Sequence, residues 1–267
     1  MSGVFQQPAD FRDESEALHG LLEGRSEDQF SHPTRFKGWT TNDVIGHLYM
    51  WNRAADQSIF EPEAFAAFMG EVADAVQSGG LRLFEQDWRG DLAGQDLRAA
   101  WREHYLEMAD RLMAEDPKRR VRWAGPDMSI RSSVTARLME TWAHGQEVYD
   151  SLGVVREDAD RIGNIAILGV NTFGWTFVNR GLEVPPHVPH VRLVAPSGAV
   201  WEWNADNDQD RIEGTATEFC QVVCQTRNIA DTELEVSGDV ARRWMDIAQC
   251  FAGRPEDPPP PGFRRCE

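Results

Sequence analysis

The amino-acid sequence predicts an α+β protein, in which an all-α helical bundle is followed by a small mixed α/β unit. Apolar residues recur at helical spacing up to about residue 180, and the pattern then changes to the alternation that is typical of β-strands. The proline-containing stretch "VPPHVPH" lies at this change. We therefore expect a helical domain over residues 1–182, an α/β domain over 183–254 and a disordered, proline-rich tail over 255–267.

Bulk composition restricts the class of protein. The chain has 267 residues, of which 41% are hydrophobic and ten are tryptophan, so it can build sizeable cores. Its formal net charge of -17 argues against binding to nucleic acids or anionic membranes, because both need a basic surface. The chain has neither a signal-peptide pattern nor a run of about 18 apolar residues. We expect a cytoplasmic protein, a monomer or a homodimer, with a small-molecule partner.

The helical domain should contain four long helices, an inserted helical segment and a shorter fifth helix. Thr40, with Asp43 three residues later, forms a capping-box pattern at the start of the second long helix. Gly24 and Gly153 are C-cap signals, and the inserted segment, residues 62–87, ends in a Gly-rich patch at Gly79 and Gly80. The expected helical segments cover residues 8–24, 40–60, 62–87, 96–116, 126–153 and 158–178.

The C-terminal unit shows strand and helix patterns in alternation. "HVRLVAPSGAVWEWNAD" indicates two strands around a Pro-Ser-Gly turn, and "DRIEG" and "ELEVSG" indicate further strands. Helices are expected at "TATEFCQVVCQTR" and "DVARRWMDIAQCFA". The cysteines, Cys220, Cys224, Cys250 and Cys266, are too few for a disulfide framework and indicate a reducing compartment. We interpret Cys220 and Cys224 as core side chains, because apolar residues surround them.

The stretch "RLMETWAHGQEVYD" contains the residues that suggest chemistry. Glu140 and His144 lie four residues apart in the fourth long helix, so their side chains project from one side of consecutive turns. Such a pair can bind one metal ion or can simply belong to a solvated face. A helical wheel places both on a polar face, which by itself favours the solvated interpretation; its other members are Ser133, Arg137, Glu147 and Ser151.

The presence of His47 favours a metal site over a solvated face. His47 lies on the second long helix, at the margin of the apolar stripe that contains Trp51. Two imidazoles and one carboxylate leave a coordination position open for water, a thiolate or a substrate oxygen. We therefore predict a divalent metal ion bound by His47, Glu140 and His144, with zinc as the first choice and nickel, iron or manganese as alternatives.

Two motifs carry a resemblance to a known family. "WTTNDVIGHL", followed in the fourth long helix by "ARLMETWAHGQEV", resembles the DinB-like metalloproteins, and among them the mycothiol-dependent maleylpyruvate isomerase group. The C-terminal "TELEVSGDVARRWMDIA" is similar to the sterol-carrier-like domain of those proteins. The resemblance implies a DinB-like four-helix bundle with His47, Glu140 and His144 as metal ligands, followed by a sterol-carrier-like α/β domain.

The resemblance also implies a function and two further site residues. It implies a metal-dependent isomerase or transferase that uses the low-molecular-weight thiol mycothiol and acts on a small metabolite. Glu147 would transfer a proton, although family members often have Asp at this position. Arg227, in "CQTRN", is the best counterpart of an arginine that contributes to catalysis in the isomerase. The structural alternatives are a solvated carboxylate for Glu147 and a surface arginine at a helix end for Arg227.

Other functions are compatible with the same three ligands. One is a thiol-independent hydrolase, lyase or cyclase that acts on a small metabolite through a metal-bound water or substrate oxygen. Another is a non-catalytic protein that binds a metal or an apolar ligand. The complete triad beside a candidate acid or base favours an enzyme over this last alternative. Non-haem iron oxygenases share the ligand set, but their usual scaffold is a β-barrel, whereas these ligands lie on predicted helices.

Overall fold

The structure, a computed structural model of the chain, describes residues 5–264. Its contacts divide the chain into two compact units, Met1–Val148 and Tyr149–Glu267. This division differs from the boundary expected near residue 182, because the helices that follow residue 160 pack against helices of the C-terminal unit. The predicted α+β class is confirmed, since the first unit is mostly helical and the second contains a four-stranded sheet.

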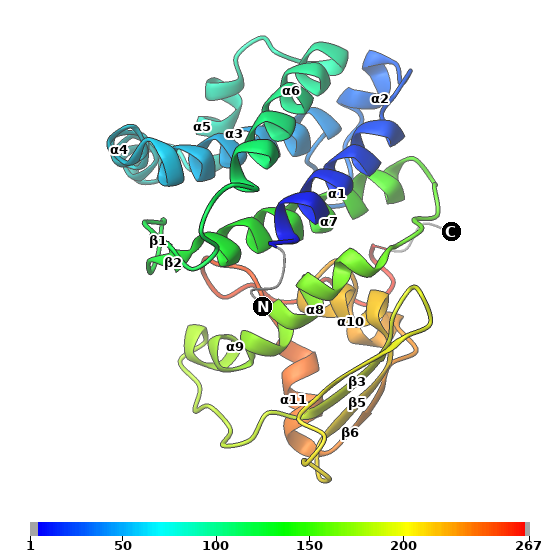
Figure 1. Cartoon of the computed structure of the whole chain (residues 1–267). Helices are drawn as coiled ribbons and strands as arrows, with labels where there is room; N and C mark the ends of the chain where they lie inside the picture. The colour runs from blue at the N-terminus through cyan, green and yellow to red at the C-terminus, as the bar shows by residue number, and fades with distance from the viewer. Residues whose placement is uncertain (1–4, 265–267) are drawn as a thin grey trace. The chain divides into compact units, whose positions relative to one another are not determined.

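The first unit is built on four long helices, α1 (Gln7–Leu21), α3 (Thr41–Phe60), α6 (Gly94–Leu112) and α7 (Ile130–Ser151) (Figure 1). The capping box predicted at the start of α3 is present, because Thr40 and Asp43 exchange hydrogen bonds between side chain and backbone. The fully buried core side chains come from all four helices and include Phe11, Leu18, Leu48, Trp101, Tyr105, Leu138 and Trp142.

Two helices inserted between α3 and α6 form a second apolar cluster with α3. They are α4 (Pro62–Ser78) and α5 (Leu81–Arg89), which are separated at Gly80, where φ is +94°. Trp51 of α3 and Phe65 of α4 are buried in this cluster, and Phe84 and Trp88 of α5 pack against it. This cluster therefore packs one face of α5 against α3, and α5 carries a residue of the site described below.

Two short elements of the first unit were not predicted. Helix α2 (Glu27–Ser31) has its own capping box from Ser26 and Gln29, but five residues are too few to show a helical period. Strands β1 (Arg120–Val121) and β2 (Met128–Ser129) form a small antiparallel hairpin before α7. The loop between these strands contains Trp123, which stacks on Phe65 of α4.

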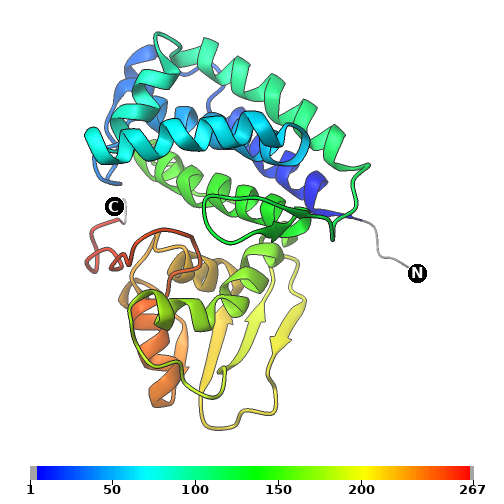
Figure 2. The same cartoon turned by 90° about the vertical axis from the view of Figure 1, so that its left-hand side faces the viewer.

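The second unit contains a sheet in the order β4-β3-β5-β6, with β3 and β5 parallel and the two outer pairs antiparallel. Its strands, β3 (His190–Val194), β4 (Val200–Trp203), β5 (Arg211–Thr215) and β6 (Glu235–Ser237), agree with the four expected segments. Helices α10 (Ala216–Val223) and α11 (Asp239–Ile247), together with α8 (Gly163–Asn171) and α9 (Phe173–Asn179), cover one face of this sheet (Figure 2). Two short 3-10 turns, Asp160–Ile162 and Ile229–Asp231, complete the unit.

The predicted fifth helix, 158–178, is divided in the structure. Thr172 lies between α8 and α9, and its hydroxyl donates hydrogen bonds to the carbonyl oxygens of Leu168 and Gly169. Such a bond from a threonine side chain competes with the regular helical pattern and bends the chain. The apolar periodicity continues across this break, which is why the sequence pattern suggested one continuous helix.

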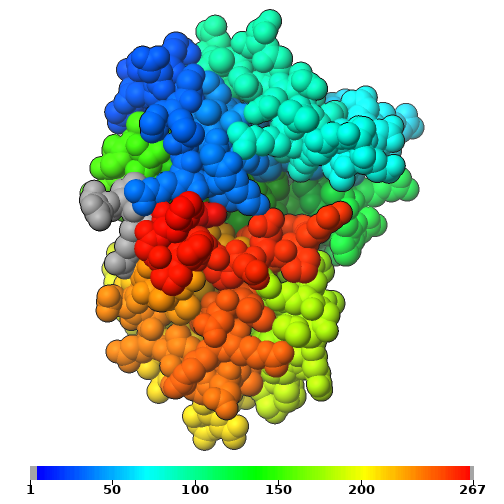
Figure 3. Space-filling view, turned by 180° about the vertical axis from the view of Figure 1, so that it is seen from behind, coloured from blue at the N-terminus to red at the C-terminus, as the bar shows by residue number. Residues whose placement is uncertain are grey.

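The proline-rich tail also differs from expectation over its described part, residues 255–264. Gln225 donates to the backbone oxygen of Glu256, Asn228 donates to that of Pro259, and Arg180 pairs with Asp257. Figure 3 shows this segment, in red, on the surface of the second unit. Cys220 and Cys224 are buried, which confirms their interpretation as core side chains, and Cys266 lies outside the described residues.

None of the helices within residues 5–264 combines the length and the apolar character that crossing a bilayer requires.

Candidate metal site

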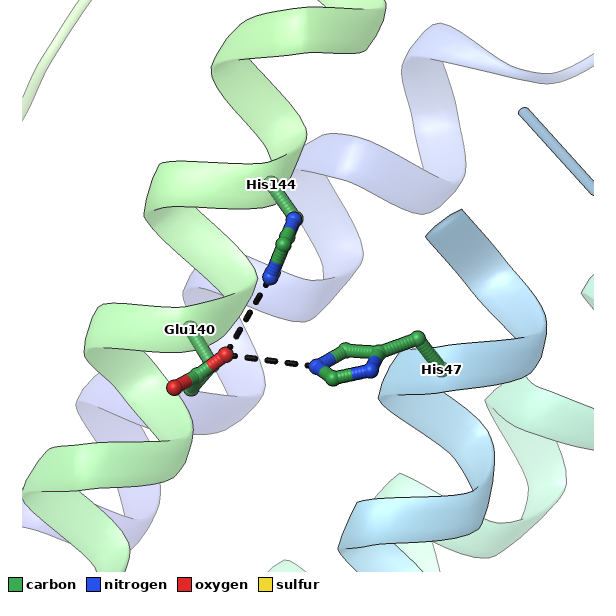
Figure 4. A group of neighbouring side chains, drawn as sticks. All are labelled: His47, Glu140 and His144. Carbon is green, nitrogen blue, oxygen red and sulfur yellow. Dashed lines mark hydrogen bonds and ion pairs between the residues drawn. The ribbon is translucent and has the colours of Figure 1, made fainter. Parts of the chain in front are cut away.

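The three predicted ligands come together inside the first unit (Figure 4). His47 projects from α3, and Glu140 and His144 project from consecutive turns of α7. One carboxylate oxygen, Oε2 of Glu140, lies 3.3 Å from Nε2 of His47 and 3.3 Å from Nε2 of His144. The ligand atoms of all three side chains lie within 4.8 Å of one another. The face of α7 that the helical wheel marked as polar therefore points toward α3.

The geometry and the donor set fit a divalent ion. A charge-assisted hydrogen bond is usually shorter than 3.3 Å, at about 2.7–2.9 Å. Two ligands of a tetrahedral zinc ion, each about 2.0–2.1 Å from the metal, lie about 3.4 Å apart. The separations around Oε2 of Glu140 match this second distance. Two imidazole nitrogens and one carboxylate oxygen are also a donor set that zinc and related ions accept.

His47 is oriented by a residue that the sequence analysis did not identify. Oε1 of Glu85, on α5, lies 2.8 Å from Nδ1 of His47, and the indole nitrogen of Trp51 donates to the same oxygen at 2.9 Å. When Glu85 is ionised, it accepts a hydrogen bond from Nδ1–H of His47, so Nε2 is the nitrogen that can bind a metal ion once it has lost its own proton. Metal-binding histidines commonly have such a carboxylate behind them.

Glu140 has a buried cation beside it. Nη2 of Arg137, one turn earlier on α7, lies 4.0 Å from Oε1 of Glu140, the carboxylate oxygen that does not face the histidines. The guanidinium is 5.4 Å from the ring centroid of Trp123, and its Nε and Nη1 atoms are buried without a hydrogen-bond partner among the described residues. A buried guanidinium is costly without a counter-charge. Arg137 and Glu140 therefore compensate each other.

The ionisation of the triad follows from these neighbours. Burial lowers the pKa of His47, but the carboxylates of Glu85 and Glu140 outweigh it and raise that pKa to about 9. Burial also lowers the pKa of His144, and its bond to Glu140 does not restore it. Burial raises the pKa of Glu140, but the two histidines and Arg137 hold it well below its usual value. Without a metal ion, His47 is therefore the cationic imidazole of the triad, His144 is the neutral one, and Glu140 is a carboxylate.

The structure also places the two predicted catalytic residues. Glu147 lies on α7 three residues after His144, and only 2% of its surface is exposed, so the solvated-carboxylate alternative does not hold. Arg227 belongs to the second unit, where its Nη1 and Nη2 atoms each donate to Asp150 at 2.7 Å. The guanidinium of Arg227 is therefore held by a bidentate pair within that unit.

Sequence analysis missed Glu85, although its segment contains a signal. Leu81, Phe84 and Trp88 form the apolar stripe of α5, and Glu85 lies within that stripe. A carboxylate on the buried face of a helix needs a partner, and it indicates either an ion pair or a site. The helical wheel identifies Arg137 only as a member of the polar face of α7, so its burial could not be inferred from the sequence.

A helical bundle with two histidines and a glutamate on two of its long helices, joined to a small α/β unit, has the DinB-like fold. The chain belongs to the family described as "Mycothiol maleylpyruvate isomerase N-terminal domain", whose sequence model matches residues 11–149. This confirms the family that the two motifs suggested.

Two kinds of relative agree with this assignment. Two Mycobacterium tuberculosis sequences, "Uncharacterized protein MT0041" of strain CDC 1551 / Oshkosh and "Uncharacterized protein Rv0036c" of strain ATCC 25618 / H37Rv, are each 38% identical over 250 residues, which cover 92% of this chain and 95% of theirs. The crystal structure of the mycothiol-dependent maleylpyruvate isomerase matches with a TM-score of 0.51 at 17% identity, over 81% of this chain and 87% of that chain. A histidine-to-alanine mutant of that enzyme matches over the same shares with a TM-score of 0.50, also at 17% identity. These structural matches show a shared fold.

The pKa of His47 predicts how metal binding depends on pH. An imidazole that is protonated on both nitrogens cannot bind a metal ion. Because the pKa of His47 is about 9, this side chain is protonated at neutral pH and must lose one proton when the metal binds. The apparent affinity for zinc should therefore rise with pH, by about tenfold per unit from this proton alone, up to about pH 9. Calorimetry in buffers of different ionisation enthalpy should detect the released proton. An affinity that stays constant between pH 6 and 8 would contradict this assignment.

The position of Glu85 predicts a second result. Glu85→Gln should weaken metal binding by about 10- to 100-fold, because the neutral amide no longer fixes the ring and tautomer of His47. It should also reduce proton release on binding, since the pKa of His47 falls without this carboxylate. Glu103→Gln, on the exposed side of α6, is the matched control and should bind the metal as the wild type does. Equal affinities of the two variants would remove Glu85 from the site.

Proposed function

We propose that this protein is a divalent-metal-dependent enzyme, with zinc as the first choice of metal, which uses a low-molecular-weight thiol to isomerise or transfer a group on a small metabolite. The observation that supports this most is the convergence of His47, Glu140 and His144 within 4.8 Å, with Glu85 behind His47. Membership of the mycothiol maleylpyruvate isomerase N-terminal domain family makes mycothiol, or a thiol like it, the expected co-substrate.

The ligand set leaves room for one exogenous ligand. A divalent ion held by two imidazoles and a carboxylate lowers the pKa of a thiol or water bound to it, so that a nucleophile exists at neutral pH. The protein must then accept the proton that this ligand releases. Glu140 is paired with Arg137, and Glu85 is already bonded to His47 and Trp51, so we look for the proton acceptor at another residue.

Glu147 is the residue that we assign to this proton. It lies one turn beyond His144 on α7, and its burial removes it from bulk solvent, where a general base would compete with water. Glu147 would therefore accept the proton from the bound thiol and return it to the product.

Arg227 is retained as the candidate that binds the carboxylate or enolate of an anionic substrate. Its bidentate pair with Asp150 means that a substrate anion would have to compete with Asp150 for the guanidinium. This makes its assignment dependent on a rearrangement inside the second unit, in contrast to that of Glu147.

The thiol requirement has a direct spectroscopic test. Cobalt-loaded protein should show visible d–d bands, and addition of mycothiol should add a sulfur-to-cobalt charge-transfer band in the near ultraviolet. His144→Ala is the control, which should lose the cobalt bands themselves. If cobalt binds but neither mycothiol nor cysteine alters the spectrum or turnover, the thiol is not a ligand. A thiol-independent hydrolase, lyase or cyclase would then replace this proposal, and a protein without turnover would be a binding protein.

The roles of the two glutamates on α7 should separate in mutants. Glu147→Gln should keep the metal but lose turnover by about 10²-fold or more, because it removes general acid and base catalysis. Glu140→Gln should weaken metal binding itself, since it removes a ligand. Metal content by elemental analysis, measured beside turnover of a maleylpyruvate-like substrate with mycothiol, distinguishes the two effects. Full activity of Glu147→Gln would show that this carboxylate has only a structural role.

A further inference from the structure

The two histidines of the triad are held in different ways. Nδ1 of His47 has a carboxylate partner, Glu85, at 2.8 Å. His144 uses Nε2 toward Glu140, and no hydrogen bond to its Nδ1 occurs among residues 5–264. A ring that is bonded through one nitrogen can still rotate about its Cβ–Cγ bond, so something else must fix its plane.

Two aromatic side chains pack against the His144 ring. The indole of Trp39 lies parallel to the His144 ring, with an interplanar angle of 2° and a centroid separation of 5.4 Å. Phe36 meets the same imidazole edge-on at 5.2 Å, and Trp39 is also 5.3 Å from the ring of His47. Trp39 therefore contacts both histidine ligands, and with Phe36 it restricts His144 from two directions.

The loop that carries these rings is built to hold them in place. Residues 33–40 fold back on themselves, with the backbone nitrogen of Thr34 donating to the carbonyl oxygen of Trp39 at 2.6 Å. The reversal uses two left-handed residues, Lys37 (φ +51°) and Gly38 (φ +69°). Arg82 of α5 donates to the carbonyl oxygens of both and pairs with Asp43. The loop is thus tied to the start of α3 and to α5.

We propose that Trp39 is a positioning residue of the metal site, whose indole fixes the ring plane of His144 in the way that Glu85 fixes that of His47. This rests on the proposed metal site. An imidazole bound to a divalent ion carries more positive charge than a free one, and the face of an indole attracts positive charge. The stacking contact is therefore stronger when the metal is bound, so it contributes to affinity for the metal as well as to packing.

The full-length protein and Co²⁺ provide the test. Trp39→Leu keeps an apolar side chain but removes the aromatic face, whereas Trp39→Phe keeps a face. We expect Trp39→Leu to weaken Co²⁺ binding on the order of 10-fold and to change the intensities of the d–d bands, because the angle of one ligand is released. Trp39→Phe should stay within about threefold of wild type with an unchanged spectrum.

Trp203→Leu is the matched control. Trp203 is a half-buried tryptophan of strand β4 in the second unit, whereas the three ligands belong to the first unit. It should lose some thermal stability without changing the affinity for Co²⁺ or the spectrum. If Trp39→Leu proves unfolded, Arg82→Met provides the same test, since it unties the loop but leaves the indole, and it should shift affinity and spectrum in the same direction.

The possible results distinguish the role of Trp39 from the existence of the metal site. Wild-type affinity and an unchanged spectrum in folded Trp39→Leu, or an equal loss in Trp203→Leu, would overturn the role of Trp39 while the metal site stands. A wild-type protein that binds no Co²⁺, with no difference from His144→Ala, would instead overturn the metal site and the role of Trp39 together. Loss in Trp39→Leu with recovery in Trp39→Phe supports it.

Discussion

One carboxylate oxygen on the inner face of α7 determines much of the first unit. Oε2 of Glu140, whose side chain is 20% exposed, lies 3.3 Å from each of two imidazole nitrogens. A carboxylate that is largely removed from water needs positive charge beside it. Arg137 supplies it near Oε1, and either a metal ion or the proton of His47 can supply it at Oε2. A proton occupies only one imidazole, whereas a metal ion would be bound by both in their neutral form. We therefore interpret the arrangement as a metal site and not as an ion pair that stabilises the fold.

Three elements outside the four-helix core hold the side chains of the candidate site in place. Helix α5 carries Glu85 to His47, and the apolar cluster of α4 and α5 keeps it there. The hairpin of β1 and β2 brings Trp123 beneath Arg137, which faces the second oxygen of Glu140. The loop over residues 33–40 brings Trp39 to His144. Each ligand is therefore supported by a segment outside the helix that bears it, so three additions to a plain four-helix core serve one site.

The sequence allowed the three side chains of the candidate site to be chosen, but not the residues that support them. Glu140 and His144 share a helix, so their spacing fixes their relation, and His47 lies on a helix with a clear start at Thr40. Glu85 and Trp39 reach the site only through tertiary packing, which no local period encodes; the single hint was a carboxylate within the apolar stripe of α5. The boundary expected near residue 182 differs from the division by contacts for a similar reason, because α8 and α9 have the helical period of the bundle but pack with α10 and α11.

The burial of the polar face of α7 is the feature that most clearly separates a site from an ordinary surface. Ser133, Arg137 and Glu147 are each at most 5% exposed, although the helical wheel placed them opposite the apolar stripe. A bundle optimised for stability alone would bury apolar side chains there, since buried ionic groups seldom stabilise a fold relative to well-packed hydrophobic ones. Keeping an arginine and two glutamates in this position costs stability that the large aromatic core must offset. Such a cost is expected where a protein has to hold a cation and move a proton away from water.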